Sequence, residues 1–194
     1  ALDTIGTNTS AIYALYPYND GGKIVVKNNN VVLDRTGATQ TVYGVYVVHS
    51  RSTPELVNTD VLVRNNTVTM GPNTKVTPTS FATTYGIYSF GFTQNSTTFL
   101  NVPSFALVDS NKFTNQIVPG SGSLFALTGS GNSSGSIGNV AIIKDNNISN
   151  ITRSAPACSS TLINGTRNKY TLIDNNDCSK FRYNNTTITS ATFS

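Results

Sequence analysis

The segment Ile24-Val25-Val26-Lys27-Asn28-Asn29-Asn30-Val31 recurs along the chain and decides the fold. Its later versions are 61–68 (VLVRNNTV), 106–113 (ALVDSNKF), 141–148 (AIIKDNNI) and 171–178 (TLIDNNDC). Each version has a short apolar strand, a polar pair, an asparagine, a variable residue and an apolar residue at which the strand resumes. Copies spaced by roughly 30 to 45 residues are typical of repeats that stack on one another.

One slot of the repeat always holds an asparagine, at Asn29, Asn66, Asn111, Asn146 and Asn176. A sharp bend between two strands needs a left-handed backbone, which asparagine tolerates better than most residues, so we expect the slot residue to take the bend. When repeats stack about 4.8 Å apart, identical asparagines can hydrogen-bond up the stack as a ladder. The alternative is a set of unrelated β-hairpins with asparagine-rich turns.

A second apolar element alternates with the first. Tyr43-Gly44-Val45-Tyr46 matches 85–88 (YGIY), with 13–16 (YALY), 125–128 (FALT) and 160–163 (STLI) as weaker versions. Helical periodicity is nearly absent, and no amphipathic helix pattern caps either end. The sequence therefore predicts one all-β domain over residues 1–194, a parallel β-helix (β-solenoid) of about five coils with an asparagine ladder and no capping helix.

This repeat resembles that of the right-handed parallel β-helix (pectate-lyase-like) superfamily, whose coils carry apolar strands and a ladder-forming asparagine turn. The resemblance covers roughly residues 10 to 182 and is closest to the non-catalytic surface and adhesin members. Since this fold also hosts lyases and hydrolases, it implies the architecture and leaves the function open.

Composition narrows the class of protein. Only 11% of the residues are charged, against about 25% in an ordinary soluble domain, and the net charge is +4. The basic residues are scattered singly, so we expect no nucleic-acid partner.

No apolar run is long enough to cross a membrane. The start at Ala1 favours a mature secreted protein, extracellular or at a cell surface, although a shortened chain would begin in the same way.

The two cysteines, Cys158 and Cys178, lie close together in the sequence. In a secreted chain an isolated pair usually forms a disulfide, and this one would close a loop of about twenty residues, contributing about 3 kcal/mol. Two buried thiols are the alternative.

Catalytic chemistry has little support in the sequence. Polysaccharide hydrolysis needs two carboxyl groups facing one glycosidic bond. Among the nine acidic residues, Asp109 and Asp174 share a repeat slot two copies apart, with Lys144 between them. His49 is the only histidine, and no zinc-ligand spacing is present. We therefore expect no enzyme activity, no metal and no cofactor.

Glycans and tyrosines are the candidate functional features. Asn-x-Ser/Thr acceptor patterns for N-linked glycans occur at Asn8, Asn65, Asn95, Asn132, Asn147, Asn150, Asn164, Asn184 and Asn185. Strand alternation predicts a core face with Leu15, Val45, Val47, Ile87 and Leu127 beside Tyr13, Tyr43, Tyr85 and Phe125. It predicts an outer face that sets Tyr16, Tyr46 and Tyr88 beside the small residues Ala14, Gly44, Gly86 and Ala126. Such a tyrosine stripe could bind carbohydrate or a neighbouring chain, or be covered by a loop.

Repeats without caps leave unpaired strand edges at both ends. We therefore expect a glycosylated structural protein that polymerises head to tail, as a subunit of an extracellular filament or a cell-surface coat. A monomeric adhesin or carbohydrate-binding module is the alternative, and a polysaccharide lyase or hydrolase a third.

Overall fold

A computed structural model describes residues 2–4, 12–19, 23–35, 41–51, 59–71, 83–93, 104–118, 124–130, 139–153, 160–165, 168 and 170–183. Within these ranges the chain is all-β and its strands pair in parallel. These ranges contain no helix that is long and apolar enough to cross a membrane.

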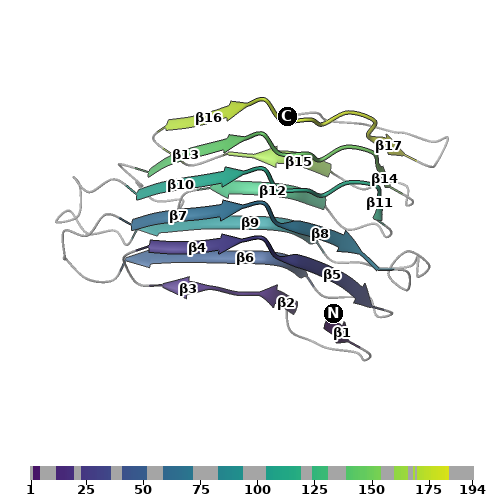
Figure 1. The fold of residues 1–194 in the computed structure, drawn as a ribbon, viewed down its shortest axis with the longest axis horizontal. Coiled ribbons are helices and arrows are strands. Elements are labelled where there is room, and N and C mark those ends of the chain that lie inside the picture. The colour runs from purple at the N-terminus through teal and green to yellow at the C-terminus, as the bar shows by residue number, and fades with distance from the viewer. Residues whose placement is uncertain are drawn as a thin grey trace.

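The strands form four sheets that run up the molecule from the N-terminal to the C-terminal end (Figure 1). The five-stranded sheet contains β4 (Lys23–Lys27), β7 (Thr59–Arg64), β10 (Ser104–Asp109), β13 (Asn139–Lys144) and β16 (Tyr170–Asp174). The six-stranded sheet contains β2 (Ile12–Leu15), β3 (Tyr18–Asn19), β6 (Val42–Arg51), β9 (Thr84–Thr93), β12 (Leu124–Ser130) and β15 (Ser160–Asn164).

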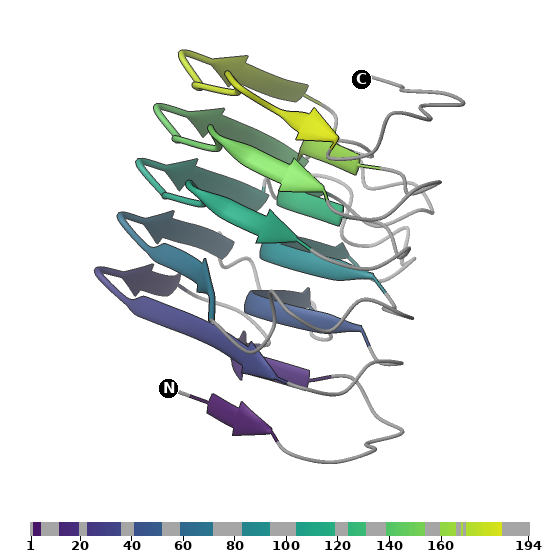
Figure 2. The same ribbon diagram turned by 90° about the vertical axis from the view of Figure 1, so that its right-hand side faces the viewer.

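Two three-stranded sheets complete the arrangement. One contains β1 (Leu2–Thr4), β5 (Asn30–Arg35) and β8 (Thr67–Met70), and the other contains β11 (Gln116–Val118), β14 (Ile151–Arg153) and β17 (Arg182–Tyr183). A short turn follows each strand of the five-stranded sheet, and Figure 2 shows these turns one above another along one edge. Each level of the stack is therefore one sequence repeat.

The register between repeats is the one that the recurring segment predicts. Val61 of β7 lies opposite Ile24 of β4 on one side and opposite Ala106 of β10 on the other. The register continues from Ala106 to Ala141 and then to Thr171. Equivalent positions of successive repeats are thus neighbours in space.

The core lies between the sheets and is filled by alternate strand residues. In β4, Ile24 and Val26 are buried while Lys23, Val25 and Lys27 are exposed. Further apolar residues from this sheet, from the other sheets and from the turns complete the interior, most of them β-branched or aromatic. Fully buried examples are Val45, Ile87, Phe113, Leu124, Ile143 and Ile151.

Strand β6 departs from the predicted alternation. Gly44 and Val45 are adjacent and both buried, so the alternation slips by one residue at this point. As a result Tyr43 and Tyr46 lie on the same side, with ring centroids 4.5 Å apart. The prediction that Tyr43 belongs to the core face and Gly44 to the outer face is therefore wrong.

The small residues of this element are required by the interior. A Cβ atom added to Gly44 would lie 2.6 Å from the carbonyl oxygen of Gly86 and 2.6 Å from Cγ1 of Val68. A Cβ atom on Gly86 would lie 2.5 Å from the carbonyl oxygen of Ala126, which is itself fully buried. Close approach of backbones favours glycine at such positions. Gly44, Gly86 and Ala126 therefore line the core and form no outer platform.

Candidate functional site: the asparagine edge and the tyrosine cluster

The bend after each strand of the five-stranded sheet is made by the residue before the asparagine slot. The left-handed φ values are 60° at Asn28, 53° at Asn65, 55° at Ser110, 55° at Asp145 and 49° at Asn175. Asparagine and aspartate visit this conformation because their short polar side chains can bond locally. The expectation that the slot asparagine itself takes the bend is therefore wrong.

The slot asparagines instead form a continuous row of side-chain hydrogen bonds. Asn66, which is fully buried, donates from Nδ2 to Oδ1 of Asn111 at 3.0 Å and to the carbonyl oxygen of Val26 at 2.9 Å. Its Oδ1 accepts from Nδ2 of Asn29 at 2.9 Å and from the backbone N–H of Asn29 at 3.1 Å. Both donors and both lone pairs of this buried amide are thus used.

The same contacts continue to the last repeat. Nδ2 of Asn111 donates to Oδ1 of Asn146 at 3.0 Å, and Nδ2 of Asn146 donates to Oδ1 of Asn176 at 2.8 Å. A buried amide left without partners would cost about 1–3 kcal/mol, so this row stabilises only the arrangement in which the repeats are in register.

Charged residues form a second row beside the ladder. The register places Lys27, Arg64, Asp109, Lys144 and Asp174 one above another. The buried carboxylate of Asp109 lies 3.0 Å from Nε of Arg64 and accepts a hydrogen bond from the hydroxyl of Ser110 at 2.6 Å. Pairing of this kind is what a buried carboxylate requires.

The exposed carboxylates near the bends are engaged with their neighbours. Asp145 accepts a hydrogen bond from Nδ2 of Asn175 at 2.6 Å and lies 3.2 Å from Nζ of Lys144, and these contacts lower the pKa of Asp145. Hydrogen bonds from Ser179 likewise lower the pKa of Asp177. Across the described part of the chain, no three His, Cys, Asp or Glu residues are grouped so as to hold a metal ion.

A second bend in the last three repeats was missed by sequence reasoning. Asn115, Asn150 and Lys180 have φ values of 56°, 56° and 57°, each five positions after the first bend (110 to 115, 145 to 150, 175 to 180). The hydroxyl and backbone N–H of Ser149 donate to Oδ1 of Asn147 and form the turn. The recurring pairs Thr114-Asn115, Ser149-Asn150 and Ser179-Lys180 are the signal that could have found it.

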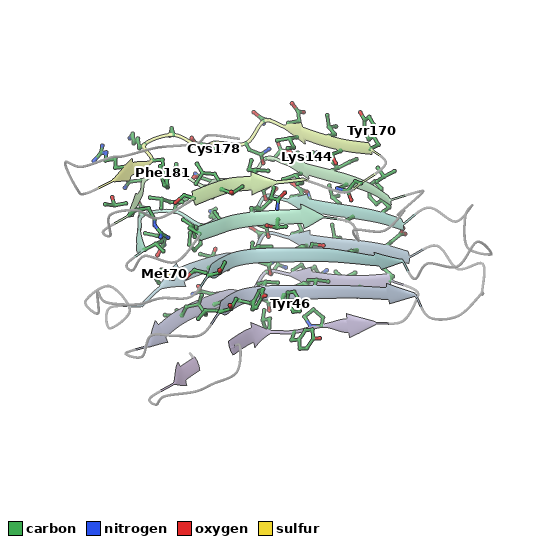
Figure 3. The ribbon with its side chains drawn as sticks, turned by 180° about the vertical axis from the view of Figure 1, so that it is seen from behind. Tyr46, Met70, Lys144, Tyr170, Cys178 and Phe181 are labelled. Carbon is green, nitrogen blue, oxygen red and sulfur yellow. The ribbon has the colours of Figure 1, made fainter. Side chains whose placement is uncertain are left out.

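The structure brings two of the three predicted stripe tyrosines together and adds a third. The rings of Tyr16 and Tyr46 have centroids 5.1 Å apart, and the ring of Tyr43 lies 4.5 Å from that of Tyr46. The side chain of Tyr16 is half exposed. Figure 3 labels Tyr46, the residue that both other rings contact. Tyr88 is the strand partner of Tyr46, although its side chain lies outside the described residues. We call Tyr16, Tyr43 and Tyr46 the tyrosine cluster.

Four of the nine predicted glycan acceptors lie in the described residues: Asn65, Asn147, Asn150 and Asn164. The other five lie outside the described residues: Asn8, Asn95, Asn132, Asn184 and Asn185. Asn65 is exposed in a first bend and donates to Oδ1 of Asn28 at 2.9 Å. Asn150 lies in a second bend and donates to Oδ1 of Asn115 at 2.6 Å. Asn147 and Asn164 are half-buried. A glycosylated amide keeps one N–H, so these bonds are compatible with a glycan.

Cys178 is a half-buried thiol near the C-terminal end of the stack (Figure 3), and burial raises its pKa. Its expected partner, Cys158, lies outside the described residues, so the disulfide stays a prediction.

Comparison of the chain with known protein families, with curated proteins and with solved structures finds no match.

The ladder can be separated from the bend by substitutions at two adjacent residues. Asn66→Ala should lower the free energy of unfolding by about 3 kcal/mol or more, because it removes the acceptor for the side chain and backbone N–H of Asn29 and the donor to Asn111 and to the carbonyl of Val26. Asn65→Gly should cost less than about 1 kcal/mol, because glycine adopts a φ of 53° readily. Urea denaturation measures both changes. Equal losses would show that the ladder adds nothing beyond the turn.

Proposed function

We propose that this chain is a β-solenoid with a structural role, whose copies join end to end into an extracellular filament or a cell-surface coat. The observation that carries the proposal is the state of the last strand of the five-stranded sheet, β16. The proposal assigns no catalytic step to the chain.

Strand β16 is apolar, and no other strand of the described residues covers its outer edge. Ile173 is 50% exposed, whereas its neighbour Ile143, one level below, is fully buried. Tyr170 and Leu172 are also exposed, and Figure 3 shows Tyr170 at the outer limit of the stack. Within the described residues β16 pairs with β13 on one side only. An apolar edge strand of this kind is a template for pairing with another chain.

A second copy is a suitable occupant because the repeat continues the sheet. Covering a half-exposed apolar side chain contributes roughly 1 kcal/mol, and pairing one strand edge with another satisfies a row of backbone groups. Because the top of one copy meets the bottom of the next, the contact is heterologous and does not close. Repetition of such a contact generates a fibre.

Glycans on the lateral surface fit this role. Asn65 and Asn150 lie in bends of interior repeats, so glycans attached there would project sideways and leave both ends of the stack accessible.

Intact-mass measurement tests the glycans. Protein isolated from its natural source should exceed the polypeptide mass of 20.7 kDa by whole glycan units, and Asn65→Gln with Asn150→Gln should remove part of the excess. A mass equal to that of the bare chain would refute this element of the proposal.

The tyrosine cluster supports a second candidate function, carbohydrate binding by a monomeric adhesin. Aromatic rings that are half exposed and close together can stack on sugar rings. Here Tyr16 presents such a ring beside Tyr46.

Electron microscopy distinguishes the two functions. End-to-end stacks of five-level copies should have an axial repeat of roughly 24 Å, five times the spacing between strands. Leu172→Lys should reduce filaments strongly, because lysine on an edge strand opposes pairing. Leu107→Lys is the matched control, since Leu107 lies in the same outward row of the sheet but in an interior strand. If the unmodified chain stays monomeric at high concentration and binds an oligosaccharide, the filament proposal is contradicted and the adhesin is favoured.

A further inference from the structure

The geometry points to one register for the joint between two copies: β4 of the next copy pairs in parallel with β16, with Lys27 opposite Asp174 and Asn29 opposite Asn176. This inference rests on the proposed end-to-end assembly and names its partner as a second copy of the chain. Three features of the two end strands carry it: unfinished hydrogen bonds, opposite charges and matching apolar residues.

The asparagine ladder ends in complementary groups. At each interior step, the backbone N–H of one asparagine donates to Oδ1 of the asparagine above it, as from Asn146 to Asn176 at 3.1 Å. Among the described residues, nothing donates to Oδ1 of Asn29, and the backbone N–H of Asn176 has no acceptor. Placing Asn29 of a second copy above Asn176 supplies the missing acceptor and continues the row.

The neighbouring row has the same property in the opposite direction. Asn65 donates from Nδ2 down to Oδ1 of Asn28, and Asn175 donates from Nδ2 down to Oδ1 of Asp145. Within the described residues, Oδ1 of Asn175 has no donor above it and Nδ2 of Asn28 has no acceptor below it. The same joint brings these two groups together.

Charge and apolar surface agree with this register. Lys27 lies at the lower end of the charged row and Asp174 at its upper end, both exposed, so the joint sets opposite charges next to each other. Two residues earlier in each strand, Val25 and Leu172 are 44% and 38% exposed and become neighbours. A shift by one residue would place side chains on opposite faces of the sheet.

The other sheets show what the joint requires. A displacement of five levels that sets β4 on β16 also sets β2 of the second copy on β15. It brings β1, which lies below β5, to the level of β17, which lies above β14. Because β1 of the second copy and β17 of the first would then occupy the same level, one of them must move aside. Both strands are short, with three and two residues.

Disulfide trapping tests the register. A chain carrying Val25→Cys and Leu172→Cys should form intermolecular disulfides on assembly, because partners in adjacent parallel strands lie about 4.8 Å apart, within the range for a disulfide. The matched control, Val25→Cys with Tyr170→Cys, offsets the pair by two residues on the same face, to about 8 Å, and should cross-link at least about ten-fold less. Mass spectrometry of the linked peptides identifies which cysteines are joined.

Reversing the charges at the joint is an independent test, because these variants keep the apolar residues Val25 and Leu172. The critical concentration for assembly is measured. Lys27→Asp and Asp174→Lys should each raise the critical concentration for assembly by roughly three-fold, and the double variant should restore it. Lys112→Asp, in an interior repeat, should leave it unchanged. Filaments that cross-link only through the offset pair, or that ignore both charge reversals, overturn this register while leaving end-to-end assembly in place. Absence of filaments from the unmodified chain overturns the proposed function itself.

Discussion

A row of buried asparagine amides is the interaction on which the rest of the structure depends. Asn66, Asn111 and Asn146 are almost inaccessible to water, yet each carries two donors and two acceptor sites on its side chain. Only a neighbour of the same kind, one level above and one level below, satisfies all of them while a strand carbonyl takes the second donor. The ladder thus fixes the register of the repeats, since a slip would leave several buried polar groups unpaired.

The apolar core and the bends work within that register. Stacking equivalent positions places Val63 beside Val108 and Val108 beside Ile143, so the β-branched side chains pack in rows. Variation between repeats is accommodated away from the ladder. The first two described repeats continue directly into β5 and β8, whereas the last three make a second bend before β11, β14 and β17. Repeat length can therefore change without breaking the row of amides.

The sequence predicted the all-β class, the parallel stacking and the residues that meet between repeats, because one recurring segment carries all three. It did not identify the bend residue, since both positions are asparagine in Asn28-Asn29, in Asn65-Asn66 and in Asn175-Asn176. The other repeats contained the answer. Ser110 and Asp145 can take a left-handed turn but neither offers an amide, so they occupy the bend, whereas the ladder slot needs a group that both donates and accepts.

The outer face of the six-stranded sheet was harder to predict for a different reason. Strict alternation holds only while a strand is regular, and burial of the adjacent residues Gly44 and Val45 breaks it. The glycines looked like small residues of an outer platform, but their size is set by Val68 and by the backbone of the next strand. Contacts across the core, which no local pattern encodes, decided that point.

Native-state hydrogen exchange at the backbone amide of Asn111 tests the ladder most directly. This N–H donates to Oδ1 of Asn146 at 2.9 Å, a bond that exists only if the asparagine row is formed. The account predicts that it exchanges as slowly as the amide of Val108 in the adjacent core strand, through opening of the whole stack. Exchange at the rate of an amide that is exposed to solvent and makes no hydrogen bond would contradict the ladder as the constraint that holds the repeats in register.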